Sequence, residues 1–263
     1  MADLLLWEHP LSPYVQKLKI GLREKGLAFT TRMPAGVGTG QVDPAFLAAS
    51  PLAEVPALHH GDVALFESRV ILAYLEEAFP RPPFMPADPL RAAKARMTET
   101  LCDTRFEAVN WAVAEITAFR RAEGEAAAAL LSVAAREIAG LHAWLERQLG
   151  AGPYLCGEMF SWADAAALPH VAGAVAAGMG PPPDGALSDW LARASTRDSV
   201  AQTFAEARAS AGGLNAARKA IAAGLFKRQY RDHRLEWMLR AGGAEIVTRG
   251  MADGTIRFSA AID

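Results

Sequence analysis

The sequence changes character at a proline-rich stretch, residues 80–89, which contains five prolines. Proline lacks a backbone N–H, so neither a helix nor a central strand continues through such a stretch. Strand and helix patterns alternate before it, and helical patterns dominate after it. The chain of 263 residues is long enough for two domains. We therefore predict domains at residues 1–80 and 90–213, a linker at 81–89 and a C-terminal extension at 214–263.

The first 80 residues mix the two kinds of pattern. Leu4–Trp7 is a short apolar run that predicts a buried strand, and Val15–Lys25 is an amphipathic run that predicts a helix. Further strands are expected at residues 28–33, 54–58 and 63–65, a short helix at 43–49, and a longer helix that opens at Phe66-Glu67-Ser68. Residues 59–62, His-His-Gly-Asp, predict the turn of a β-hairpin. This order predicts an α/β layer around a small mixed sheet.

One glycine-rich segment interrupts that order. Residues 34–41 contain Gly36, Gly38 and Gly40. A phosphate-binding loop should open a capped helix, and none is evident here. We therefore interpret the segment as a mobile surface loop.

The segments after the linker are rich in alanine and have a helical period. Helices are expected at residues 90–119, 123–149, 161–178, 187–194 and 198–209, which predicts a helical bundle. The extension carries nine Lys or Arg and five Asp or Glu, a net charge of +4. Its basic cluster Lys227–Arg234 includes an acidic residue in a helical setting, so we expect a solvated face rather than a nucleic-acid site. Residues 244–258 predict a short helix ended by Gly254, followed by an extended end.

Composition argues against several classes of protein. The net charge of −2 gives no support to binding of nucleic acid or a membrane surface. The two cysteines, Cys102 and Cys156, form no CxxC or Cys/His cluster, so neither a metal site nor a dithiol centre is expected. Few cysteines, no signal-peptide pattern and no apolar run of about 20 residues lead us to expect a cytoplasmic protein without a membrane span.

The stretch His9-Pro10-Leu11-Ser12-Pro13-Tyr14 lies between the first predicted strand and helix. Pro13 suits the first helical position, where a missing N–H costs nothing. Ser12 then has two interpretations. It is a good N-cap residue, and its hydroxyl also lies at a helix N-terminus, where an anion such as a thiolate is stabilised.

An ordered set of motifs resembles one known family. Ser12-Pro13-Tyr14, then Glu54-Val55-Pro56-Ala57-Leu58, then Phe66-Glu67-Ser68 occur within 70 residues. A helical region with Ser161-Trp162-Ala163-Asp164 follows. Over roughly residues 3–210 the chain resembles the cytosolic glutathione S-transferases, and Ser12 resembles the serine-type tau and zeta-like classes, whereas the omega class has cysteine there. The resemblance implies a thioredoxin-like domain followed by an all-helical domain.

The resemblance also implies a glutathione site. A cis Pro56 would turn the backbone of Val55 toward the ligand, so that the N–H and C=O of Val55 pair with the cysteinyl part of glutathione. Glu67 and Ser68 would hold its γ-glutamyl end. Ser12 would donate a hydrogen bond to the thiolate, with Tyr14 as the competing donor. Tyr14, Phe106, Asn110 and Trp111 are candidates for the electrophile pocket. Ser161 and Asp164 have the spacing of a capping box, a structural role.

Two functions remain open on the sequence. One is a glutathione transferase with glutathione as co-substrate, no metal, an apolar electrophile and a homodimeric assembly. Its reaction would be conjugation, or a related ether cleavage, dehalogenation or isomerisation. The other is a non-catalytic binding or scaffold protein with the same fold. Thiol-disulfide reduction is disfavoured because Ser12 cannot form a mixed disulfide.

Overall fold

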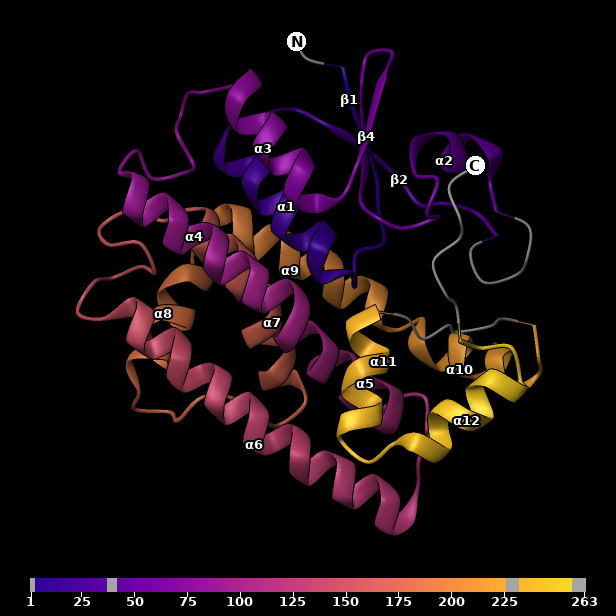
Figure 1. Cartoon of the computed structure of the whole chain (residues 1–263). Coiled ribbons are helices and arrows are strands. Elements are labelled where there is room, and N and C mark those ends of the chain that lie inside the picture. The colour runs from indigo at the N-terminus through magenta and orange to yellow at the C-terminus, as the bar shows by residue number, and fades with distance from the viewer. Residues whose placement is uncertain (1–2, 37–41, 226–231, 257–263) are drawn as a thin grey trace.

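A computed structural model describes residues 3–36, 42–225 and 232–256 (Figure 1). The first domain contains β1 (Leu4–Trp7), α1 (Pro13–Glu24), β2 (Thr30–Arg32), α2 (Pro44–Ala49), β3 (Ala57–His60), β4 (Val63–Phe66) and α3 (Ser68–Ala78). The four strands have the order β2-β1-β3-β4, with β1 parallel to β2 and the other pairs antiparallel. This is the predicted thioredoxin-like arrangement of an α/β layer around a small mixed sheet.

Apolar side chains hold the sheet from both faces. Leu4, Leu6 and Leu58 are buried with the apolar residues of α1 and α3. On the other face Trp7 and Ala57 are buried with Phe46 of α2. Each buried large side chain contributes about 1.5–3 kcal/mol. The sheet is therefore a firm platform for the loops at its edges.

The hairpin differs in detail from its prediction. His59 and His60 belong to β3 and pair with Ala64 and Val63, so the expected four-residue turn is wrong. The turn itself is only Gly61-Asp62, and Gly61 has a φ of 57° that favours glycine. The Nδ1 atom of His60 lies 2.6 Å from the hydroxyl of Tyr74, so this histidine faces α3.

The second domain is helical, as predicted. It contains α4 (Pro89–Leu101), the π-helical turn η1 (Cys102–Phe106), α5 (Glu107–Thr117), α6 (Gly124–Leu149), α7 (Trp162–Ala176), α8 (Ala186–Ser195) and α9 (Asp198–Ala211). The segments α4, η1 and α5 follow one another without a break, where the sequence predicts one long helix. Helix α7 packs on both α1 and α4, and most of its residues are buried. It thereby joins the two domains.

The predicted capping box begins α7. The Oδ2 atom of Asp164 accepts from the backbone N–H of Ser161 at 2.9 Å and from its hydroxyl at 3.0 Å. The Oδ1 atom accepts from the N–H of Leu155 at 2.9 Å and from the indole of Trp190 at 2.8 Å. Asp164 thus stabilises the helix start and also binds α8 and the preceding loop.

The extension packs on the helical domain. It forms α10 (Leu214–Ala222), α11 (Asp232–Arg240) and α12 (Ala244–Ala252), and α11 lies against α5 (Figure 1). Trp237 and Met238 of α11 are buried in the main core. The expected short helix near residues 244–258 is α12, which ends just before Gly254. Most of the basic cluster at 227–234 and of the glycine-rich segment at 34–41 lies outside the described residues.

Among the described helices, only α6 has the length and composition of a membrane span. Its buried residues form one stripe that includes Leu130, Ala134, Ile138 and Leu145. A stripe of this spacing is the pattern of a helix that lies along a bundle. Length and composition alone are weak evidence for a span.

Candidate active site

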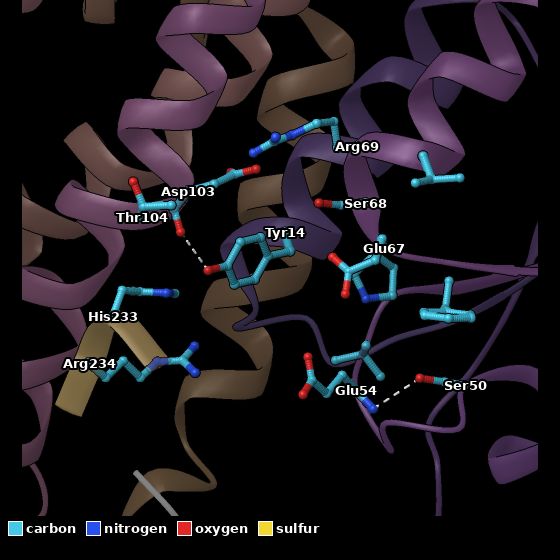
Figure 2. A pocket seen from close by; sticks show the side chains of 14 residues that line it. Tyr14, Ser50, Glu54, Glu67, Ser68, Arg69, Asp103, Thr104, His233 and Arg234 are labelled. Carbon is cyan, nitrogen blue, oxygen red and sulfur yellow. Dashed lines mark hydrogen bonds between the residues drawn. The ribbon is translucent and has the colours of Figure 1, made fainter. Parts of the chain in front are cut away.

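A cavity of about 390 Å³ lies between the first domain, the α4–α5 region and α11 (Figure 2). Five residues predicted from the sequence line it: Tyr14, Val55, Pro56, Glu67 and Ser68. They come from three separate positions in the chain, α1, the loop before β3 and the start of α3. The fold therefore brings the predicted motifs together in one place.

Glu67 and Ser68 form the entrance to α3. Ser68 is the first residue of this 11-residue helix and is buried. The N-terminus of such a helix presents unpaired N–H groups that suit a carboxylate. Glu67, immediately before it, has a φ of 71°. A non-glycine residue in that region costs about 1–3 kcal/mol and is often found at binding sites. Figure 2 shows Glu67 and Ser68 on the same side of the cavity.

The Val55–Pro56 peptide bond is cis, as predicted. Both residues line the cavity just before β3 begins. Nearby, the hydroxyl of Ser50 accepts from the backbone N–H of Glu54 at 3.1 Å, which supports this loop (Figure 2). Ser50 was not predicted from the sequence, because nothing in the local pattern distinguishes it from other loop serines.

Ser12 caps α1, and Pro13 is the first helical residue. The Ser12 oxygen accepts from the N–H of Val15 at 3.4 Å. Ser12 is not among the residues that line the cavity. A hydroxyl that accepts a hydrogen bond keeps its own O–H for donation. The cap hydrogen bond therefore leaves the Ser12 hydroxyl able to donate, and the structure shows its role as a cap.

Tyr14 reaches into the cavity but donates its hydroxyl to the carbonyl of Asp103 at 2.7 Å (Figure 2). The side chain of Asp103 binds Lys17 at 2.6 Å, and Lys17 also binds Glu99 at 2.7 Å. Burial alone would lower the pKa of Lys17, but the two carboxylates hold it above its ordinary value of 10.5. Lys17 is only 1% exposed, so this charged group fixes α1 against α4 and η1.

The other electrophile-pocket candidates do not line this cavity. Phe106 is fully buried between His142 and His170, with ring centroids 5.5 and 5.8 Å away. Burial lowers the pKa of His142 to about 4 and that of His170 to about 3, so both rings are neutral at pH 7. Asn110 donates to the carbonyl of His170 at 2.8 Å. These contacts give Phe106 and Asn110 structural positions.

Trp111 lies behind the cavity wall. The guanidinium of Arg234 stands over its ring, 5.4 Å from the centroid. Trp111 is partly buried against the core. It supports a lining residue and is not itself part of the lining.

The extension supplies two lining residues, His233 and Arg234, that the sequence interpretation missed. Both bind the buried carboxylate of Glu107 on α5. His233 Nε2 lies 2.6 Å from Oε2, and Arg234 Nε lies 2.9 Å from Oε1 with Nη2 bound to the same oxygen. Burial alone would raise the pKa of Glu107, but Arg234 and His233 hold it below its ordinary value of 4.5. A basic residue in α11 and an acid in α5 carry no local signal that they meet.

The described residues contain no group of three or more His, Cys, Asp or Glu side chains able to hold a metal ion. The cavity offers polar side chains and a helix N-terminus, next to the apolar residues Val55, Pro56, Phe66 and Val70. Such groups suit a small zwitterionic ligand with carboxylate and ammonium groups.

Comparison with known proteins identifies the family. Residues 6–83 match the glutathione S-transferase N-terminal domain, and residues 117–193 match the glutathione S-transferase C-terminal domain. A Stringent starvation protein A homolog of Haemophilus influenzae is 30% identical over 200 residues, covering 74% of this chain and 86% of that protein. The chain belongs to the glutathione S-transferase superfamily.

Other relatives in the superfamily match over shorter stretches. The Stringent starvation protein A homolog of Haemophilus ducreyi is 36% identical over 85 residues, 32% of this chain. Glutathione S-transferase 3 of Zea mays is 44% identical over 80 residues, 30% of this chain. The matched segments span only 38% and 36% of these two relatives. The names are of two kinds, so superfamily membership does not by itself assign catalysis.

Two solved structures extend the similarity to the whole fold. FzlA from C. crescentus has a TM-score of 0.67 at 26% identity, covering 77% of this chain and 92% of that one. A glutathione S-transferase of Methylobacterium radiotolerans, in complex with glutathione sulfonate, has a TM-score of 0.60 at 27% identity, covering 76% and 94%. The superfamily fold thus accounts for about three-quarters of the chain.

Proposed function

We propose that this protein binds glutathione in the cavity and activates its thiol for attack on an electrophile. One observation carries the proposal: Val55, Pro56, Glu67 and Ser68, predicted from separate motifs, line the same cavity. The γ-glutamyl carboxylate would lie at the N-terminus of α3, its ammonium near Glu67, and the cysteinyl backbone along Val55. The glutathione sulfonate complex of the Methylobacterium radiotolerans relative supports this choice of ligand.

Ser12 is the proposed thiolate donor. A free thiol has a pKa near ~8.5, and lowering it by ~2 units requires about 2.7 kcal/mol of preferential thiolate binding. A hydroxyl donor to an anion contributes roughly 1.5–3 kcal/mol. The N-terminus of α1 adds about 0.3–1 kcal/mol. The sum is of the required size, and the thiolate would then attack an electrophile held in the cavity.

Calorimetry with glutathione is the first test, and no binding at millimolar concentration would overturn the proposal. Turnover of a chloroarene with glutathione is the second. Ser12→Ala should lower kcat about ten- to a hundredfold, more than it weakens glutathione binding, because one charge-assisted hydrogen bond is lost. It should also raise the pKa in the pH profile of kcat/KM.

Two matched variants sharpen that test. Ser12→Thr keeps both the cap and the hydroxyl, so it should retain most of the activity. Tyr14→Phe removes the competing hydroxyl, which already donates to Asp103. Full activity in Ser12→Ala with loss in Tyr14→Phe would transfer the thiolate role to Tyr14 and contradict a serine-type enzyme.

A second candidate is a glutathione-fold protein that binds without turnover. The observation that favours it is the charge of part of the cavity wall. Glu54, Glu67, Asp103 and Arg234 stand beside the apolar residues Val55, Pro56, Phe66 and Val70, so an apolar electrophile would meet charged groups there. The Stringent starvation protein A homologs among the relatives lend it support. Glutathione binding without conjugation of chloroarenes, enones or epoxides would favour this candidate.

We also propose a cytoplasmic homodimer, as the family resemblance implies. Val70 on α3 and Met97 on α4 are 51% and 48% exposed, and apolar side chains of this kind suit a protein interface. Sedimentation equilibrium tests the assembly directly. A monomer at micromolar concentration would contradict it.

A further inference from the structure

The basic residues on the cavity wall lie in two groups. Within the described part of the chain these are Arg69, next to Ser68 on α3, and the pair His233 and Arg234 on α11. Figure 2 shows the α11 pair across the cavity from Ser68, with Tyr14 between them. The pair therefore faces the end of the cavity that is remote from the proposed γ-glutamyl position.

Arg234 is held in a fixed orientation. Its guanidinium binds Glu107 through two nitrogen atoms and stands over the Trp111 ring. Its side chain is 13% exposed, and that of Glu107 is 4% exposed. A guanidinium held in this way loses little conformational entropy when it binds a further acceptor.

The charges of this cluster do not cancel when His233 is protonated. Glu107 provides one negative charge, while Arg234 and the protonated imidazole provide two positive charges. The imidazole and the guanidinium both present polar groups to the cavity.

Glutathione has two carboxylates, and only one is assigned under the proposed function. The glycyl carboxylate, or a carboxylate on the electrophile, remains to be matched with a basic group. We propose that His233 and Arg234 form a carboxylate subsite, supplied by the C-terminal extension and positioned by Glu107. This inference rests on the proposed function, since it assumes that glutathione derivatives bind in the cavity.

The test measures binding of three ligands by calorimetry: S-benzylglutathione, its glycyl ethyl ester and S-(4-carboxybenzyl)glutathione. The ester removes the glycyl carboxylate, and the third ligand adds one at the electrophile end. Each is measured with the full chain, with Arg234→Gln and with Arg234→Lys. Arg240→Gln is the matched control, because Arg240 lies on the same helix and binds Glu137 away from the cavity.

Two affinity ratios are measured: S-benzylglutathione against its ethyl ester, and S-(4-carboxybenzyl)glutathione against S-benzylglutathione. In the unchanged protein, one of these ratios should be about tenfold or more in favour of the ligand with the additional carboxylate, as expected for a charge-assisted hydrogen bond. That ratio should fall toward one in Arg234→Gln and remain unchanged in Arg240→Gln. It should fall less in Arg234→Lys, which keeps the charge but loses the two-nitrogen contact with Glu107 and the stacking on Trp111. A difference between acid and ester identifies the glycyl carboxylate as the ligand. A difference between the two benzyl ligands identifies the electrophile's carboxylate.

Two outcomes would overturn the subsite, and they are distinguishable. Equal binding of all three ligands, or a ratio unaffected by Arg234→Gln, rejects the subsite while the proposed function stands. If Arg234 has only a structural role, Arg234→Gln loosens α11 and lowers the affinity for all three ligands by the same factor, so the affinity ratio stays unchanged. Failure of every ligand to bind the unchanged protein rejects the proposed function and the subsite with it.

Discussion

On one side of the cavity, Val55, Glu67 and Ser68 lie next to the paired ends of β3 and β4, in a sheet whose two faces are packed with apolar side chains. On the other side, His233 and Arg234 lie on a helix of nine residues that binds Glu107 through charged groups. Burial of apolar surface depends little on pH or salt, whereas ion pairs depend on both. The first side should therefore keep its geometry under conditions that release the second.

The extension is not held by charge alone. Trp237 is 2% exposed and Met238 is fully buried, and the Trp237 indole donates to Glu137 at 3.0 Å. These contacts anchor the middle of α11. The charged contacts of His233 and Arg234 orient its first turn, which is the part that reaches the cavity.

Glu107→Gln should have the largest effect on the difference in stability between the sheet side and the α11 side of the cavity. Breaking a buried ion pair costs about 3–5 kcal/mol, and the partial exposure of Arg234 and His233 reduces our expectation to about 2–3 kcal/mol. Urea unfolding measures the loss, and hydrogen exchange should show faster opening of α11 than of α1. The matched control is Glu236→Gln, which removes an exposed pair with Arg105. Equal loosening of α1 and α11 would mean that the two sides are not held independently.

Substitutions on the sheet side should weaken glutathione binding without loosening α11. Ser68→Ala and Glu67→Ala are each expected to raise the KM for glutathione about tenfold. Each removes a contact remote from the sulfur that stabilises the bound substrate and the transition state equally, and such a loss appears in KM. Unchanged KM in both variants would place the γ-glutamyl group elsewhere.

Glu67→Gly separates the carboxylate from the backbone at the same position. Glycine adopts the observed φ of 71° without strain. The variant should lose glutathione affinity like Glu67→Ala yet be more stable than Glu67→Ala by about 1 kcal/mol. Thermal unfolding compares the two, and equal stability would show that the positive φ costs nothing.

Acid should separate the two sides in a defined direction. The pKa of Glu107 is lower in the folded protein than its ordinary value of 4.5, so its contribution to stability is present above that pH. The contribution is lost as the pH falls from 4.5 through the folded-state pKa. Hydrogen exchange followed from pH 6 downward should show α11 opening before the strands β1 and β3. Simultaneous opening would contradict a charge-dependent attachment.

Arg240→Gln should have the smallest effect. Arg240 binds both oxygens of Glu137 at 2.7 and 2.9 Å, but its side chain is 48% exposed. Exposed pairs contribute about 0–1 kcal/mol, so the unfolding free energy should change by less than about 1 kcal/mol. A larger loss would make this pair a principal anchor of α11.

The features that could be predicted from the sequence are those that depend on residues close together in the chain. β1, the start of α1 and the Ser161–Asp164 capping box each depend on residues a few positions apart, and each was predicted. The contacts of Glu107 with His233 and Arg234 span 126 and 127 positions. No periodicity or cap links such residues, so this side of the cavity could not be predicted.

Phe106 illustrates a second kind of error. An apolar residue on a helix can face a ligand pocket or the core, and its sequence spacing is the same in both cases. The structure buries Phe106 between two neutral histidines. His59 and His60 are a related case, because polar residues near a glycine were interpreted as a turn although they extend a strand.

The π-helical turn η1 determines which side chains of the continuous α4–α5 helix face the cavity and which face α11. A π-turn contains one residue more than an α-helical turn, so every position after it is rotated by about 100° from where an uninterrupted helix would place it. Asp103 inside the turn faces the cavity, and Glu107 just beyond it faces α11. The same residues in a regular α-helix would point Glu107 away from Arg234, so the wide turn is what allows this helix to bind the extension. Insertion of one residue between Phe106 and Glu107 would advance Glu107 by about 100° and release the extension, although every residue that lines the cavity would be retained.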